Sequence, residues 1–112
     1  MDLSQSIIDS IPVIIVSGKI DASTSKDLDA ALNALIDQNK TRLVIDMEKV
    51  EYLSSSGLRV LMAAQNRLRK MKGNLMLISL QPFVKEVFVI TGANRLFAVY
   101  QSQAEAINSL KS

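Results

Sequence analysis

The stretch Arg42–Leu61, "RLVIDMEKVEYLSSSGLRVL", changes its hydrophobic period part of the way along. Its first six residues, Arg42–Met47, are a short β-rich apolar run that is typical of a buried strand. The next six, Glu48–Leu53, are expected to be a short connection. Further on, apolar residues recur at helical spacing, and these are Leu58, Leu61, Ala64, Leu68 and Met71. The stretch therefore joins a strand to a helix, which is the repeating unit of an α/β fold.

Upstream of this unit, the segments Ser6–Ile8 and Val13–Ser17 are separated by the turn formers of "DSIP", which predicts a hairpin. Gly18 is expected to mark a tight strand exit. The pattern then becomes helical, with an apolar stripe made of Leu28, Ala31, Leu32, Leu35 and Ile36. Thr24 followed by Asp27 resembles a capping box, so we expect the helix to begin there.

Downstream, Gly73 is expected to end the central helix in a left-handed conformation. A strand is predicted over Leu75–Leu80. Pro82 and Gly92 then bracket a short helix, although its β-branched residues would suit a strand equally well. A last strand, Leu96–Tyr100, and a capped helix, Ser102–Leu110, complete the order ββαβαβαβα.

This order predicts one α/β domain over residues 1–112, with helices packed on a mixed, mostly parallel sheet whose first strand is antiparallel. The length of 112 residues and the hydrophobic content of 48% suit one compact folded domain.

The composition excludes several kinds of chemistry. Without cysteine or histidine there is no disulfide, no thiolate nucleophile, no usual zinc site and no Ser-His-Asp triad. We therefore expect no metal or cofactor and no enzymatic activity. Glycine-rich nucleotide motifs are also absent, so nucleotide binding is not expected. Apolar runs such as Ile11–Val16 are far shorter than the roughly 20 residues of a membrane span, and a signal peptide is not evident, so we expect a soluble, cytoplasmic protein without membrane insertion.

The net charge is +2, and basic residues are concentrated in one segment, Asn66–Lys72, "NRLRKMK". This segment is either a patch for phosphate or acidic lipid, or a cationic last turn that complements the helix dipole. The lack of interleaved aromatic residues and of a helix-turn-helix pattern favours the second interpretation, so we expect no direct contact with nucleic acid.

The serine run Ser54–Ser56 stands where the central helix begins. The first N–H groups of a helix have no partner within it, so a serine hydroxyl or an anion has to satisfy them. One interpretation is a plain helix cap with a polar loop. The other is a phosphorylation switch, because a phosphate here would be stabilised by the free N–H groups and would repel a docked partner.

The segment "YLSSSGLRVL" resembles the phosphorylation-site turn of STAS domains, and specifically of the stand-alone anti-sigma factor antagonists, or anti-anti-sigma factors. The resemblance extends over nearly the whole chain. "VSGKIDASTSKDLDAAL" is similar to the second strand and first helix of that family, and "ITGANRLFAVYQSQAEAI" is similar to its last helices and strand.

The resemblance implies that Ser55 is the phosphoacceptor, with Ser54 and Ser56 as alternatives. Ser54 stands where many members of the family have aspartate. The partner-binding residues that the resemblance implies are Asp21, Ser23, Thr24, Asp46, Ser54, Ser56, Gly57 and Arg59. For Asp21 and Asp46, a capping or turn-stabilising carboxylate is an equal alternative.

The function that the resemblance implies is a partner switch. The unphosphorylated protein would bind an anti-sigma factor that is also a serine-protein kinase, phosphorylation would release it, and a serine phosphatase would reset the switch. An alternative keeps the fold and makes the chain a soluble STAS subunit of a membrane transport or scaffold assembly.

Overall fold

The computed structural model describes residues 1–111, in which five strands form one sheet in the order β1-β2-β3-β4-β5. The strands are β1 (Asp2–Ile8), β2 (Ile11–Ile20), β3 (Arg42–Leu53), β4 (Asn74–Ile78) and β5 (Ala98–Tyr100). β1 is antiparallel to β2, and every other neighbouring pair is parallel. The predicted α/β fold with an antiparallel first strand is therefore confirmed.

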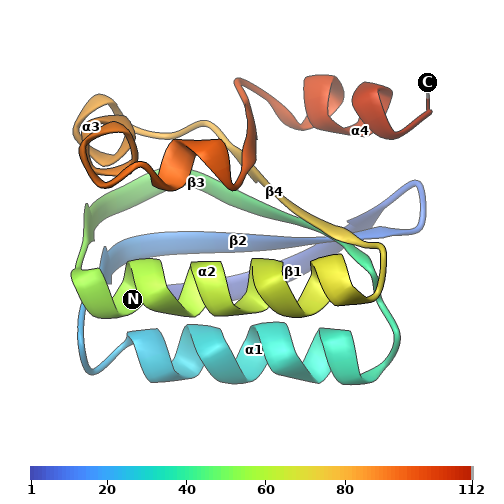
Figure 1. Ribbon diagram of the computed structural model, residues 1–112, viewed down its shortest axis with the longest axis horizontal. Helices are drawn as coiled ribbons and strands as arrows, with labels where there is room; N and C mark the ends of the chain where they lie inside the picture. The colour runs from blue at the N-terminus through green and yellow to red at the C-terminus, as the bar shows by residue number, and fades with distance from the viewer. Residues whose placement is uncertain (112) are drawn as a thin grey trace.

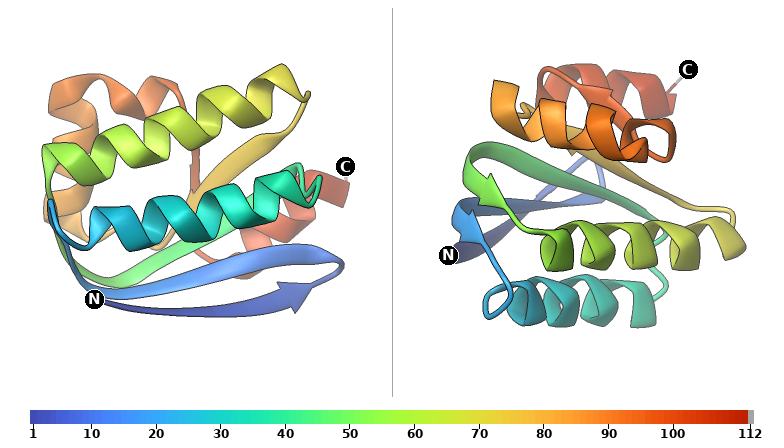
Figure 2. Two further views of the ribbon diagram at one scale, coloured as in Figure 1. Left: turned by 90° about the horizontal axis from the view of Figure 1, so that it is seen from below. Right: turned by 60° about the vertical axis from the view of Figure 1, so that its left-hand side comes forward.

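Helices cover both faces of this sheet (Figure 1). They are α1 (Ser25–Asp37), α2 (Ser55–Lys70), α3 (Pro82–Thr91) and α4 (Gln103–Lys111), with a short 3-10 turn, η1 (Ala93–Arg95). α1 and α2 run side by side across one face (Figure 2), and α3 joins their apolar cluster through Val84 and Phe88. α4 packs Ala106 and Ile107 on the opposite face. β2 is buried on both faces, which explains its nearly continuous apolar sequence.

The predicted hairpin is confirmed, but its strands are longer than expected. The turn consists of Asp9 and Ser10, whose φ angles of 51° and 68° are both left-handed, as in the two-residue turns that suit twisted strands. Pro12, expected in the turn, instead lies in β2 opposite Ile7.

β3 is also longer than predicted, because it continues from Met47 to Leu53 through a segment expected to be a connection. Beyond Asp46, which pairs with the last residue of β4, it pairs with β2 alone. Gly18, expected at a strand exit, lies inside β2 at a bulge in this extension, with a φ of 92°. The paired ends of β2 and β3 therefore project past β4.

The end of α2 differs from the prediction as well. The left-handed residue is Lys72, with a φ of 60°, and not Gly73. Gly73 is needed for space, since a Cβ there would lie 2.1 Å from the backbone oxygen of Thr41. The Asn74 N–H donates to that same oxygen at 2.8 Å, so the close approach joins the end of α2 to the start of β3.

One buried polar side chain, Gln65 in the middle of α2, was not predicted. Its Oε1 accepts from the Leu75 N–H at 2.7 Å, and its Nε2 donates to the Leu96 backbone oxygen at 2.7 Å. The same amide is 2.9 Å from Asn74 Oδ1. Gln65 therefore fastens α2 to β4 and to the segment that leads into β5.

The basic segment Asn66–Lys72 has partners within the chain. Arg67 forms an ion pair with Asp37 at 2.6 Å and donates to Asn33, which joins α2 to α1. Arg69 donates to the Leu96 backbone oxygen at 2.8 Å. These contacts favour the structural interpretation of the segment. In residues 1–111, none of the helices has the length and apolar character needed to cross a membrane.

Candidate functional site

The candidate site is the turn that leaves β3 and enters α2. The Ser54 N–H donates to the Ile20 backbone oxygen at 2.8 Å, which fastens the turn to the end of β2. Both strands end here, and α1 and α2 begin at this same end of the sheet (Figure 1). The carboxyl ends of parallel strands are the usual place for binding in such folds.

Ser54 is the N-cap of α2. Its backbone is extended, and its Oγ accepts from the Gly57 N–H at 3.1 Å, the bond that a capping serine is expected to form. Replacing a capping serine by alanine typically lowers stability by about 1 kcal/mol. The half-buried Ser54 hydroxyl therefore serves the helix start.

Ser55 is the first residue of α2, and its side chain is exposed. Among residues 1–111, its hydroxyl has no hydrogen-bond partner, and the adjacent Ser56 is half-buried. Of the three serines, Ser55 thus combines an exposed side chain with a hydroxyl that the fold does not use.

Gly57 lets the first turn of α2 lie directly against the strand ends. A Cβ at this position would be 2.6 Å from Ile20 Cγ2 and 2.8 Å from Leu53 Cδ1, closer than ordinary packing allows. The glycine of the turn is therefore required by packing, and α2 has no space to retreat toward the sheet.

Asp21 organises the neighbouring loop, which enters α1. Its Oδ1 accepts from the N–H groups of Thr24 and Ser23, at 2.9 and 3.0 Å, and from both of their hydroxyls. These bonds, led by that of the Thr24 N–H, lower the pKa of Asp21 to about 2. The expected Thr24–Asp27 capping box is absent, because the Thr24 Oγ1 accepts instead from the Asp21 N–H. The turn-stabilising role of Asp21 is thus observed directly.

The lowered pKa predicts a pH-dependent effect of Asp21→Asn. The carboxylate stabilises the fold at pH values above 3.8, the ordinary pKa of an aspartate, and this contribution disappears as the pH falls toward about 2. We therefore expect the variant to have a lower Tm than the wild type at pH 7, and the difference to shrink between about pH 4 and pH 2. Thermal unfolding followed by circular dichroism measures the Tm of both proteins at each pH. Glu86→Gln, an exposed carboxylate on α3, is the control, and a pH-independent Tm difference would contradict the prediction.

Asp46 is not brought to the turn. It lies within β3 opposite Ile15 and Ile78, and its Oδ1 accepts from the Glu48 N–H at 3.0 Å. Its Oδ2 is 3.5 Å from Gln103 Nε2 at the start of α4. The strand continues to Leu53, which places Asp46 roughly 20 Å from the serines. A local role at the start of α4 fits Asp46 better than contact with a partner at Ser55.

Arg59 follows Ser55 by one helical turn, so the two exposed residues share one side of α2. In the described part of the chain, the Arg59 guanidinium has no ion-pair or hydrogen-bond partner. Together with Ser23 and Thr24 in the Asp21 loop, it completes the predicted residues that the structure gathers at this end of the sheet.

An aromatic pair beside the turn was not predicted from the sequence. Tyr52, two residues before Ser54, stacks on Phe83 at the start of α3, with ring centroids 6.5 Å apart. Both side chains are substantially exposed. Their exposure was not predictable, because Tyr52 was placed in a connection and Phe83 in a helix whose faces were not assigned.

Comparison with known proteins supports a family assignment. The family model of the STAS domain matches residues 3–106. BtrV of Bordetella bronchiseptica, named among the anti-sigma factor antagonists, is 34% identical over 112 residues, which are 100% of this chain and 97% of BtrV. The anti-sigma-B factor antagonist of Listeria monocytogenes is 32% identical over 92 residues, covering 82% of this chain and 81% of the relative.

Among solved structures, the crystal structure of an anti-sigma factor antagonist from Mycobacterium paratuberculosis superimposes with a TM-score of 0.90 at 29% identity. The match covers 99% of this chain and 94% of that one. The family model, the relatives and the shared fold agree over nearly the full length. This chain belongs to the STAS domain family.

Proposed function

We propose that this protein is an anti-sigma factor antagonist whose binding is switched off by phosphorylation of Ser55. The observation that carries the proposal is the division of roles within the turn. Ser54 caps α2, whereas the neighbouring Ser55 hydroxyl is exposed and unused by the fold. The relatives that match over most of this chain carry the same functional name.

The geometry suits a phosphate on Ser55. A phosphoserine brings roughly −1.5 to −2 charges at pH 7. The N–H groups of the first helical turn and the positive end of the helix dipole stabilise such an anion. Arg59 adds a cation on the same side of α2. The fold therefore accepts the modification without rearrangement.

A partner docked over the turn responds differently. Its surface would have to remove water from a dianion that it does not pair, which costs several kcal/mol. In this proposal the unphosphorylated protein binds an anti-sigma factor that is also a serine-protein kinase, and phosphorylation releases the complex. A serine phosphatase restores the binding form. In this proposal the STAS domain acts in the cytoplasm, and the chemistry is performed on it by other enzymes.

The test uses the purified anti-sigma factor kinase encoded in the same genome. Incubation with this kinase and ATP is expected to add one phosphate, which fragmentation by mass spectrometry places on Ser55. Ser55→Ala is the control and is expected to remain unmodified. A phosphate on Ser54 or Ser56 would correct the acceptor. A phosphate elsewhere, or no phosphate at all, would refute the proposed switch.

A further inference from the structure

Helix α3 carries two neighbouring rows of apolar residues, of which only one is fully buried. Val84 and Phe88 are buried in the core. Phe83, Val87 and Ile90 recur at the spacing of a second helical stripe, and we call these three residues the α3 stripe. Phe83 is 41% exposed and Ile90 76% exposed. The apolar surface of α3 is therefore wider than the part that the core covers, and Phe83 and Ile90 leave an apolar stripe exposed in the isolated chain.

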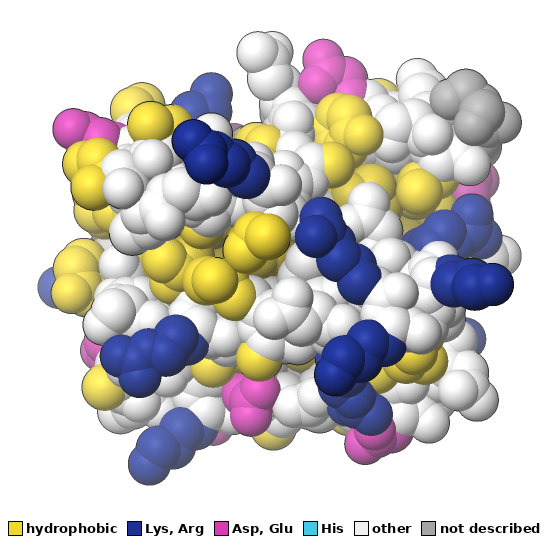
Figure 3. All heavy atoms as spheres, in the orientation of Figure 1, with side chains coloured by type: hydrophobic (Ala, Val, Ile, Leu, Met, Phe, Trp, Pro, Cys, Tyr) yellow, Lys and Arg dark blue, Asp and Glu magenta, His cyan; other side chains and the backbone are white. Residues whose placement is uncertain are grey.

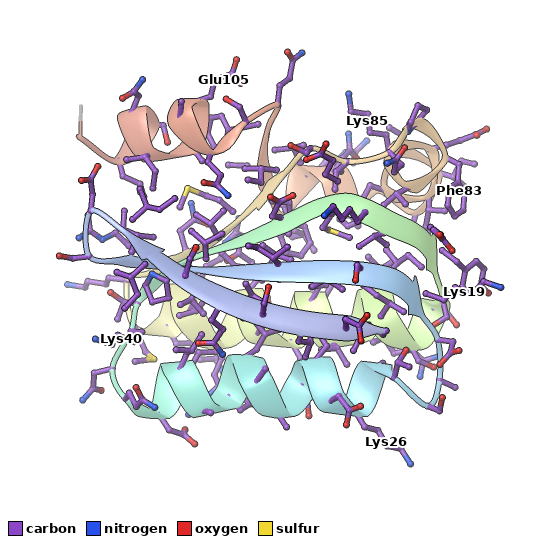
Figure 4. All side chains as sticks on the ribbon, turned by 180° about the vertical axis from the view of Figure 1, so that it is seen from behind. Lys19, Lys26, Lys40, Phe83, Lys85 and Glu105 are labelled. Carbon is purple, nitrogen blue, oxygen red and sulfur yellow. The ribbon has the colours of Figure 1, made fainter. Side chains whose placement is uncertain are left out.

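The α3 stripe is continuous with the candidate site. Phe83 stacks on Tyr52, and Tyr52 precedes the capping Ser54 by two residues. Figure 4 shows Phe83 at the same end of the molecule as Lys19, the residue paired with Tyr52 in the extended β2–β3 ladder. In Figure 3, hydrophobic side chains gather over α3 and continue toward α2.

A shallow hollow borders the first residue of the stripe. Phe83 lines it together with Gly18, Val50 and Gln81, and the charged Glu48, Lys49 and Glu51 also contribute. A side chain of a docked protein could enter this hollow beside the Tyr52–Phe83 stack. Aromatic residues in such surroundings are enriched at the energetic centre of protein interfaces.

A stable interface with a partner protein also needs more surface than the serine turn provides. A standard protein–protein interface involves about 20 to 30 residues on each side. The Asp21 loop and the first turns of α2 offer fewer residues than this, and many of these are polar. A protein docked on Ser55 must therefore extend further, and the Tyr52–Phe83 stack places an apolar surface directly beside the turn.

We propose that the α3 stripe and Tyr52 form the apolar part of the surface that the anti-sigma factor covers, and that this factor presents a complementary apolar patch. The inference rests on the proposed function and divides the interface into two parts. The α3 stripe provides much of the affinity, and Ser55 provides the control. A second copy of this chain is the competing occupant.

The test compares two isoleucine-to-serine variants. Ile90→Ser changes the α3 stripe, whereas Ile7→Ser changes an equally exposed isoleucine, 72% against 76%, beside the hairpin turn at the opposite end of β2. The probe is the same purified anti-sigma factor kinase, and the Kd is measured by calorimetry without ATP. We expect Ile90→Ser to weaken binding at least about tenfold and Ile7→Ser to change it less than about twofold. Thermal unfolding of both variants checks that each is folded.

The outcomes separate this inference from the proposed function. If Ile90→Ser binds as tightly as Ile7→Ser while Ser55→Asp binds weakly, the α3 stripe is not the interface and the switch stands. If the wild type neither binds the kinase nor is phosphorylated by it, both proposals are wrong. If sedimentation shows a wild-type dimer that Ile90→Ser abolishes, the occupant is a second copy, and the inference is overturned.

Discussion

Replacing Ser55 with aspartate is expected to weaken binding to the anti-sigma factor kinase by roughly thirtyfold, which corresponds to about 2 kcal/mol. The reason is the charge that a docked partner would have to cover at an exposed position of the turn. The fold should be unaffected, because an acidic residue in the first turn of a helix interacts favourably with the dipole. Ser55→Ala, which adds no charge, is expected to bind within about twofold of the wild type.

Surface plasmon resonance with the immobilised kinase measures these affinities in the absence of ATP. Ser4→Asp is the matched control, because it adds the same charge at an exposed serine of the edge strand β1. It should bind as tightly as the wild type. Equal affinities for Ser55→Asp and Ser55→Ala would show that the turn is not a charge-sensitive interface, and the proposed switch would have to be abandoned.

Gly73→Ala is expected to lower the free energy of unfolding by about 3 kcal/mol or more. The new Cβ would lie 2.1 Å from the Thr41 backbone oxygen, and backbone moves aside less readily than a side chain. A shift of Thr41 would strain its hydrogen bond with the Asn74 N–H and the pairing of Arg42 with Asn74, where the β3–β4 ladder starts. Urea denaturation followed by circular dichroism measures the loss.

Gly92→Ala is the comparison for this variant. Nothing lies within 4 Å of the Cβ position at Gly92, but its φ of 77° is left-handed, so alanine there should cost only about 1 kcal/mol. If Gly73→Ala were no less stable than Gly92→Ala, the steric explanation of Gly73 would be wrong.

The order of the elements was predictable because the hydrophobic period changes cleanly from strand to helix. The α1 stripe illustrates this, since Leu28, Leu32, Leu35 and Ile36 are buried as expected. Pro82 and Gly92 likewise begin and end α3 as predicted. Such local patterns depend on neighbours in sequence, which is why they could be recognised without a structure.

Features that depend on distant neighbours were missed. The far half of β3 carries exposed charges at Glu48, Lys49 and Glu51, because it pairs with β2 alone beyond the end of β4. The bulges in that pairing also disturb the simple alternation that a strand prediction needs. Gly73 was correctly singled out but for the wrong reason, since the residue that leaves no space for a side chain is Thr41, which lies just before β3.

The serine turn at the centre of the candidate site was predictable, whereas the surface around it was not. The serine turn was recognised from its residue types, yet only the fold distinguishes the capping Ser54 from the exposed Ser55. Asp46 was expected near the turn because its strand was expected to end at Met47. The apolar stripe of α3 was not predicted because the apolar region of that helix is wide, so the sequence does not indicate which part of it the core covers.

The hydrogen bonds of Gln65 bear on how a partner protein could recognise phosphorylation at the start of α2. They fasten α2 to β4, and Arg69 fastens the last turn of α2 to Leu96, so sliding or rotation of the helix would break these hydrogen bonds. If Ser55 is phosphorylated as proposed, we therefore expect the backbone to keep one shape and only the surface potential around the first turn to change. In that case, a protein that distinguishes the two forms is expected to bind at or close to that turn, because the charge is screened within about 10 Å in salt solution.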